Sequence, residues 1–494
     1  MWHVDPPQTH LRSAAARCFP VVVALLLSLN ALQSAETKAE SIDRLLQSCA
    51  DTGRFQGSVL VADNGQVILQ KGYGMANVEL NVPNRPETKF RVGSLTKQFT
   101  AMLVLQLAAR GRVKLDGRLC DYVPEYPRVT AERITLHHLL THQSGIPNYT
   151  TSEFIARRSR DFFTPLELAA TFWDKPLDFE PGAKCSYSNS GYHMLGLVVE
   201  KVTGKQYEQA LREYILDPLE MRDTGYDHSE AVLPNRASGY TKTPDGLQNS
   251  PFANMSIPYS AGGMYSTVQD LRKWDAALYT EKLLGKKYVD LLFEPAVKFG
   301  GDRAYGYGWM LSTWTLPVSK QALRVQEHFG GINGFSSMIA RLPDDRSLIV
   351  VLANILGSEW GGATRGIAQV LYGEQPETPK PSLADALARG IRERGIDTAV
   401  AECNQRRDKY DASQEELNAL GYLYLRAGRL REAVEVFKVN IEIFPNRWNV
   451  YDSLGEAYSA AGNRELAIES YRKALERNPQ SVTARRAIAE LERK

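Results

Sequence analysis

A pattern of glycine, tyrosine, alanine, an aromatic residue and proline occurs twice in the last third of the chain, the second copy 34 residues after the first. A fixed period of this length indicates helical units that stack side by side, because one unit alone cannot bury its apolar face. Glycine and alanine suit places where two helices approach closely, aromatic rings fill the space between them, and proline closes each unit. The two copies consist of Gly421, Tyr424, Ala433, Phe437 and Pro445, and of Gly455, Tyr458, Ala467, Tyr471 and Pro479.

The period and the order of these residues resemble the tetratricopeptide repeat, in which each unit is a pair of helices. Two repeats rarely bury enough surface alone, so we expect a degenerate helix pair in residues 383–410 and a capping helix in residues 482–493. Residues 375–382 contain several prolines and are the predicted linker. This assigns an all-α tetratricopeptide-repeat domain to residues 383–494, with a concave surface that would bind a protein or peptide partner.

The N-terminus has the pattern of an export signal. Arg12 and Arg17 precede an apolar run over residues 19–32, and small residues follow it up to Ala35. The run is short for a helix that crosses a bilayer, which needs roughly twenty apolar residues. We therefore predict a signal peptide in residues 1–35, cleaved near Ala35, and a bacterial protein that is exported to the periplasm or secreted. An uncleaved signal would instead serve as a membrane anchor.

The overall composition restricts the class of partner. The 494 residues carry a net charge of +2, with 23% charged and 43% hydrophobic residues. A chain with this balance lacks the basic surface that binding to nucleic acid requires. Its length also exceeds what one ordinary core accommodates. We therefore expect a further domain in residues 36–374, a small-molecule or peptide substrate, and no nucleic-acid partner.

Strand and helix patterns are mixed within residues 36–374. Alternating segments separated by turn residues predict two β-hairpins, and apolar residues at helical spacing predict a helix between them. Strands at both ends with helices between them indicate an α+β domain: an antiparallel sheet whose terminal strands pair, flanked by helices, plus a helical lobe. The predicted strands are residues 57–62 and 66–71, around Asp63-Asn64-Gly65, and residues 334–341 and 347–354; the predicted helix is residues 94–110.

Ser94 and Lys97 lie three residues apart at the start of the predicted helix. This spacing places a hydroxyl and an amine on one helix face, one turn apart, where the amine could activate the hydroxyl. Ser94 could instead be a helix cap, but Glu or Gln usually follows a capping serine three residues later. A cation in the first turn opposes the helix dipole, which lowers the pKa of Lys97 and favours a neutral base.

Tyr187 and Asn189 offer a phenol and an amide two residues apart, and both could point into one cleft. A lysine ammonium beside Tyr187 would stabilise its phenolate, so the tyrosine could take a serine proton and return it to a leaving group. The alternative is a turn that contains a buried tyrosine.

The third motif is His328-Phe329-Gly330-Gly331, at the start of the predicted hairpin that contains residues 334–341 and 347–354. Glycine lets the backbone approach a ligand closely. The N–H of Gly331 and that of Ser94 could therefore stabilise a tetrahedral oxyanion together. His328 alone could instead be a hydrogen-bonded histidine at the end of a strand.

Taken in order, the three motifs resemble the β-lactamase and penicillin-binding family, in particular its branch of class C β-lactamases, D-aminopeptidases and esterases. The resemblance covers residues 42–372 and implies the β-lactamase/transpeptidase-like fold. It places the family's serine-lysine motif on Ser94 and Lys97 and its tyrosine-x-asparagine motif on Tyr187 and Asn189.

The resemblance implies a serine hydrolase that forms an acyl-enzyme on an ester, amide or peptide. Lys97 and Tyr187 would take the Ser94 proton, and the N–H groups of Ser94 and Gly331 would hold the oxyanion until water releases the acyl group. The third motif departs from the lysine-threonine-glycine that is usual in true lactamases. A free histidine such as His328 is only about one quarter protonated at pH 7, so a substrate carboxylate loses a dependable partner and neutral substrates are favoured.

Two alternative functions have weaker support in the sequence. His138 and His142 are spaced for zinc on a predicted helix, but Leu139 stands where a metalloprotease has glutamate. We therefore expect no metal and no cofactor. The chain could also be a catalytically weak, penicillin-binding-like scaffold or sensor that binds partners through its repeats. The intact set of serine, lysine and tyrosine argues against that alternative.

Overall fold

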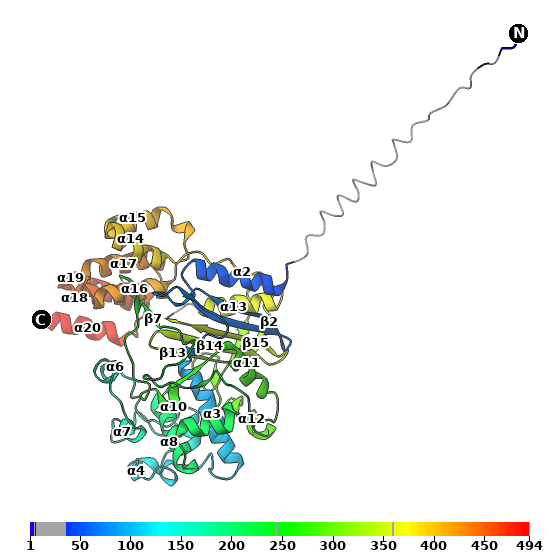
Figure 1. Ribbon diagram of the computed structural model, residues 1–494. Helices are drawn as coiled ribbons and strands as arrows, with labels where there is room; N and C mark the ends of the chain where they lie inside the picture. The colour runs from blue at the N-terminus through cyan, green and yellow to red at the C-terminus, as the bar shows by residue number, and fades with distance from the viewer. Residues whose placement is uncertain (4, 6–35, 244, 358–359, 494) are drawn as a thin grey trace.

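The computed structural model describes residues 1–3, 5, 36–243, 245–357 and 360–493, and the apolar run of the predicted signal peptide lies outside them. Figure 1 shows a mixed domain of sheet and helices, with the helical C-terminal region packed beside it. Within the described ranges, every helix is too short or too polar to span a membrane.

An eight-stranded antiparallel sheet forms the centre of the N-terminal domain. Its strand β1 pairs with β2 on one side and with β15 on the other, so that Gly57 lies between Tyr73 and Ala353. The prediction that the terminal strands pair is confirmed. In spatial order the strands are β10 (Val297–Lys298), β11 (Ala304–Tyr305), β12 (Met310–Thr315), β13 (Ala322–Ile332), β14 (Phe335–Leu342), β15 (Ser347–Ala353), β1 (Gly57–Asp63) and β2 (Gln66–Tyr73).

Helices cover both faces of this sheet. In β1, Val59 and Val61 belong to the core on one face, whereas Leu60 and Ala62 belong to the core on the other. Such an uninterrupted apolar run is typical of a strand that is buried on both sides. The first face is covered by α2 (Lys38–Asp51) and α13 (Trp360–Leu371), and α11 (Val268–Ala277) packs on the second (Figure 1). The core on the second face continues into α3 (Thr96–Ala109) and into α8 (Asn189–Thr203), which packs on α3.

Both predicted hairpins are present, as β1–β2 and β14–β15. Strands β13 and β14 form a further hairpin directly before the second of them. Asn64 and Gly65, with φ of 49° and 77°, form the turn between β1 and β2. The sequence analysis did not identify the turn Asn333-Gly334, which joins β13 to β14. The His328 motif therefore lies in the last part of β13, inside a strand and next to this turn.

The helical lobe is built around α3, in which every residue from Thr96 to Leu107 is buried. Two of its polar side chains are hydrogen bonded to surrounding elements: Gln98 accepts a hydrogen bond from Trp274 (2.9 Å), and Thr100 donates one to the carbonyl of Ser260 (2.6 Å). The lobe also contains η1 (Gly93–Leu95), η2 (Leu119–Asp121), α4 (Arg128–Ala131), α5 (Leu136–Leu140), α6 (Ser152–Arg158), α7 (Pro165–Ala170), α9 (Tyr207–Leu211), η3 (Arg212–Leu216), α10 (Tyr259–Gly262) and α12 (Lys286–Leu292).

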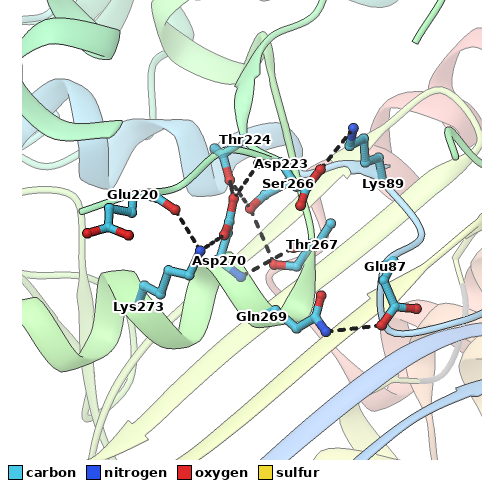
Figure 2. Close-up of polar contacts among 10 residues, drawn as sticks. All are labelled: Glu87, Lys89, Glu220, Asp223, Thr224, Ser266, Thr267, Gln269, Asp270 and Lys273. Carbon is cyan, nitrogen blue, oxygen red and sulfur yellow. Dashed lines mark hydrogen bonds and ion pairs between the residues drawn. The ribbon is translucent and has the colours of Figure 1, made fainter. Parts of the chain in front are cut away.

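A polar network around the buried Asp270 anchors the segment that leads into α11 (Figure 2). The Asp270 carboxylate accepts hydrogen bonds from the backbone of Asp223 (2.8 Å), from the Thr224 hydroxyl (2.9 Å) and from Lys273 (2.7 Å). Thr224 is in turn hydrogen bonded to Ser266, the last residue of strand β9 (Met264–Ser266). The network thus fixes β9, and with it the preceding helix α10, against the lobe.

Three small sheets complete the domain. They are β5 (Phe90–Arg91), β9 (Met264–Ser266) and β6 (Gly225–Tyr226); β3 (Met75–Asn77) and β4 (Val82–Pro83); and β16 (Ile355–Leu356), β7 (Tyr240–Thr243) and β8 (Gly246–Asn249).

The C-terminal region consists of helix pairs, as the repeat predicts. A Cβ added at Gly421 would lie 2.4 Å from the Phe437 ring, and one at Gly455 would lie 2.9 Å from the Tyr471 ring. Glycine is therefore required where the two helices of each pair meet. The helices are α14 (Leu383–Arg394), α15 (Ile396–Gln405), α16 (Gln414–Arg426), α17 (Leu430–Ile443), α18 (Trp448–Ala460), α19 (Arg464–Arg477) and α20 (Val482–Arg493).

The hairpin of β7 and β8 contacts the repeats. Lys242 forms an ion pair with Asp385 on α14 (2.7 Å), and Asp245 forms one with Arg429, just before α17 (3.6 Å). All four side chains are at least partly exposed to solvent, so each pair contributes little to stability.

Candidate active site

Ser94 lies in η1, directly before α3, and lines a cavity of about 260 Å³. The preceding Gly93 has φ of 50°, a conformation that favours glycine. A Cβ at Gly93 would lie 3.0 Å from the backbone nitrogen and oxygen of Gly331 in β13. This turn therefore holds the Ser94 backbone against β13 while its side chain reaches the cavity.

Lys97 follows Ser94 in sequence and is 0% exposed. Its Nζ lies 3.1 Å from Ser94 Oγ, 2.8 Å from Asn189 Oδ1 and 2.7 Å from the carbonyl oxygen of Ala261. Burial lowers the pKa of Lys97 well below its usual value, because the ammonium is deprived of water. The predicted direction was right, but burial rather than the helix dipole is the cause.

The neutral form of Lys97 fits these three contacts. A neutral amine has two N–H groups, and the oxygens of Asn189 and Ala261 are positioned to accept both. The nitrogen lone pair is then free to accept the Ser94 hydroxyl proton. The arrangement suits a base rather than a fixed cation.

Tyr187 lies next to both Ser94 and Lys97. The Lys97 Nζ is 4.8 Å from the centre of the Tyr187 ring. Burial raises the pKa of Tyr187, and a hydrogen bond with Ser94 opposes this only in part. The prediction of a stabilised phenolate is therefore wrong, because a neutral Lys97 supplies no positive charge. Tyr187 is instead a neutral phenol that can pass a proton onward.

Asn189 is held by residues that the sequence analysis did not single out. Its backbone N–H donates to Asn148 Oδ1 (3.1 Å), and its side-chain Nδ2 donates to Thr150 Oγ1 (2.9 Å). With its nitrogen bound to Thr150, the amide must present its oxygen to Lys97. The segment containing Asn148 and Thr150 has no short motif that would have revealed this role.

The register of the sheet turns the Gly331 N–H toward the site. Ile332 and Phe335 flank a two-residue turn and so form a hydrogen-bonded pair. Because such pairs alternate along an antiparallel ladder, the next pair, Gly331 and Ser336, is not hydrogen bonded. The Gly331 N–H therefore faces away from β14, and both Gly331 and Ser94 line the cavity. This is the donor pair that an oxyanion requires.

His328 is 1% exposed and is absent from the residues that line the cavity. Its Nδ1 donates to the carbonyl of Phe329 (2.7 Å), and its Nε2 lies 3.1 Å from the Tyr305 hydroxyl. Burial is the main cause that lowers the pKa of His328 to about 3. The expectation of a histidine that is one quarter protonated at pH 7 is therefore wrong, and His328 is a neutral residue behind the site.

The two histidines considered for zinc do not share a helix. His138 lies in α5, which ends at Leu140, whereas His142 lies beyond it with φ of 58°. Its ring packs 4.3 Å from that of Tyr187. The described part of the chain contains no group of three His, Cys, Asp or Glu side chains arranged to hold a metal ion.

The cavity next to Ser94 is lined by neutral residues. Every one of the described residues that line it carries an apolar, hydroxyl, amide or glycine side chain. Asn254 and Asn333 supply amides at its wall, and the sequence analysis missed both. The Asn-Gly signal at Asn333 would have placed that residue at a hairpin turn.

Comparison with known proteins agrees with this architecture. Residues 42–374 match the Beta-lactamase family, and residues 449–481 match the Tetratricopeptide repeat. Penicillin-binding protein 4* of Bacillus subtilis is 27% identical over 383 residues, which cover 74% of this chain and 82% of that protein.

Solved structures include a penicillin binding protein from Bacillus halodurans, 27% identical, with a TM-score of 0.58 over 66% of this chain and 98% of that one. A D-stereospecific amidohydrolase from Streptomyces sp. is 27% identical, with a TM-score of 0.55 over 67% of this chain and 98% of that one. The family match spans the sheet, the lobe and every candidate site residue, and the chain therefore belongs to the beta-lactamase family.

Proposed function

We propose that this protein is a serine hydrolase that forms an acyl-enzyme at Ser94 and prefers neutral esters or amides. The observation that carries this proposal is the placement of a buried Lys97 amine, with a lowered pKa, between two oxygen acceptors and the Ser94 hydroxyl. A buried lysine that is neutral at working pH can remove a serine proton, whereas an exposed ammonium cannot.

In the proposed acylation step, the Ser94 proton moves to Lys97 while Ser94 Oγ bonds to the substrate carbonyl carbon. The N–H groups of Ser94 and Gly331 stabilise the tetrahedral oxyanion. The bond from carbon to the leaving group then breaks, Tyr187 gives its proton to that group, and the Lys97 ammonium reprotonates Tyr187. Water attacks the acyl-enzyme by the same path in reverse, which releases the acid and restores Ser94.

The preference for neutral substrates follows from the cavity. A substrate carboxylate finds no cation among the described residues that line it, and His328 behind it is neutral. A hydrogen bond to a charged group contributes about 1.5 to 3 kcal/mol, so its loss weakens binding about ten- to a hundredfold. Amide hydrolysis is also supported by the likeness to a D-stereospecific amidohydrolase.

A substrate panel tests this function. Purified protein would be assayed with a short-chain p-nitrophenyl ester, a D-amino-acid amide and a penicillin, with Ser94→Ala as the control. We expect Ser94-dependent turnover of the neutral ester or the amide, with a kcat/KM at least tenfold above that for the penicillin. An inert wild type would favour the scaffold or sensor alternative, and efficient penicillin turnover would contradict the proposed preference.

The location and the partner of the protein are further parts of the proposal. The signal pattern at residues 1–35 supports export, and the tetratricopeptide match supports capture of a protein or peptide by the repeats. N-terminal sequencing of the protein recovered from a bacterial periplasm would test export, with a mature start near Glu36 as the expected result.

A further inference from the structure

The segment that carries Tyr187 has no sheet or helix of its own. Residues 184–188 have no regular secondary structure, and α8 begins only at Asn189. Hydrolysis as proposed requires the phenol to stay within hydrogen-bond reach of Ser94, since a displacement of about 1 Å can cost about a hundredfold in rate. Some other part of the chain must therefore fix this segment.

His142 binds the backbone on both sides of Tyr187. Its carbonyl oxygen accepts a hydrogen bond from the N–H of Ser186 (2.9 Å), and its ring Nδ1 accepts one from the N–H of Ser188 (3.1 Å). The ring also lies 4.3 Å from the Tyr187 ring, at an angle of 37°. One residue thus contacts three successive positions, and the middle one is the proposed proton carrier.

The backbone of His142 is in an unfavourable conformation. Its φ of 58° lies in the left-handed region, which is unfavourable for a residue other than glycine. Two backbone hydrogen bonds hold this conformation. The His142 N–H donates to the carbonyl oxygen of Leu139, and the Gln143 N–H donates to that of His138 (2.8 Å). Strain of this kind persists where the surrounding structure requires it, and it is concentrated at functional sites.

The ring of His142 has a defined tautomer. Nδ1 accepts a hydrogen bond from Ser188, so the proton of the neutral ring is on Nε2. Nε2 is buried and has no hydrogen-bond partner among the described residues, which is unfavourable for a buried N–H group. Burial is the main cause that keeps the pKa of His142 well below its usual value, so the ring remains an acceptor at neutral pH.

We propose that His142 is a positioning residue, which holds the Tyr187 phenol beside Ser94 through the two backbone hydrogen bonds and the ring contact. This inference rests on the proposed function. It assigns no proton transfer to His142 itself: the residue acts through Tyr187.

Two substitutions separate the hydrogen bond from the backbone strain. Glycine and asparagine both tolerate the left-handed conformation. His142→Gly removes the ring and with it the Nδ1 that accepts the hydrogen bond from Ser188. His142→Asn instead places an acceptor oxygen on Cγ, at the position that Nδ1 has in histidine. His137→Asn is the matched control, because this neighbouring histidine is hydrogen bonded to Tyr307 and not to the Tyr187 segment.

Each variant would be assayed with the neutral ester after a thermal melt has shown that it is folded. We expect His142→Gly to lower kcat about tenfold or more with KM within about threefold, and His142→Asn to recover most of that loss. His137→Asn should stay within about twofold of wild type. Normal kcat in His142→Gly, a loss confined to KM, or an equal loss in the asparagine variant would each overturn the inference.

A measurement that needs no activity completes the test. In ¹⁵N-histidine NMR of the wild type, Nδ1 of His142 should give the resonance of an unprotonated nitrogen and Nε2 that of a protonated one. The opposite tautomer would overturn the inference. If the wild type is inert toward every substrate, the proposed function fails and the inference fails with it. An active wild type with an equally active His142→Gly defeats the inference alone.

Discussion

Lys97 and Tyr187 lie beside Ser94, and His328 lies behind them, 6.3 Å from the Tyr187 ring. Burial favours the neutral form of all three side chains. It lowers the pKa of Lys97, raises that of Tyr187, and lowers that of His328 to about 3. In every case the neutral form is favoured, because charge is poorly solvated there. The first charges to form at this site are therefore those of the reaction itself, where low polarity strengthens their interaction with the oxyanion donors.

His328 makes the stability of the folded protein depend on pH. The unfolded chain binds a proton at this histidine as the pH falls below about 6.5, whereas the folded chain does not until about 3. The contribution of His328 to the free energy of unfolding is thus fully present above about 6.5 and is lost progressively as the pH falls. Denaturant melts of wild type and His328→Gln at pH 7.5 and pH 5 should show the variant gaining stability relative to wild type at the lower pH. A difference that does not change with pH would contradict the buried, neutral assignment.

At the scale of elements, the contact between β13 and η1 aligns the two oxyanion donors. A Cβ at Gly330 would lie 2.1 Å from the carbonyl oxygen of Val92 and 3.0 Å from the backbone nitrogen of Ser94. The two backbones are therefore packed too closely for any side chain. Gly331 supplies the N–H group that faces the oxyanion. Gly330 lets β13 approach η1 closely enough for that N–H to lie beside the N–H of Ser94.

We expect Gly330→Ala to lower acylation of Ser94 about tenfold to a hundredfold, because the added methyl group pushes β13 away from η1. The effect should fall on kcat more than on KM, since the oxyanion forms only during reaction. Gly285→Ala is the control, because a Cβ there meets nothing within 4 Å. Acylation at the wild-type rate in a folded Gly330→Ala protein would show that this contact does not align the donors.

The elements that sequence predicts best are those fixed by nearby residues. The helix pairs follow from the repeated glycine and aromatic positions, and the β1–β2 turn follows from Asn64-Gly65. The pairing of Ser94 with Lys97 likewise follows from their spacing on one turn. Features that depend on contacts between distant segments were missed or misjudged. Nothing local indicates that His142 binds Ser186 and Ser188, or that His328 is enclosed by Tyr305, and burial of this kind sets the protonation of the site.

In the whole molecule, the repeats contact the N-terminal domain through the β7–β8 hairpin and through an ion pair between Arg54 and Asp411 (3.4 Å). Every candidate catalytic residue precedes residue 375. The ion pairs Lys242–Asp385 and Asp245–Arg429 are at the surface, where such pairs contribute about 0 to 1 kcal/mol each. The repeats are thus attached to the catalytic domain without supplying any residue that lines the cavity.

Deletion of residues 383–494 should therefore leave kcat/KM for a neutral ester within about threefold of wild type, with capture of a repeat-bound partner lost. The full-length variant Asp385→Asn with Arg429→Gln is the control, since it breaks the two ion pairs of the β7–β8 hairpin and keeps the repeats. A truncated protein that is soluble, melts cooperatively and yet is inactive would show that the repeats support the active site.

If Ser94 is an activated nucleophile, a serine-directed phosphonylating or acylating probe reacts with it, and intact-protein mass spectrometry detects the adduct. The wild type should gain the mass of one adduct, located at Ser94 by peptide mapping, and Ser94→Ala should gain none. Lys97→Ala should label at least about a hundredfold more slowly, because it lacks the base. Equal labelling of wild type and Ser94→Ala, or an adduct at another residue, would contradict the account.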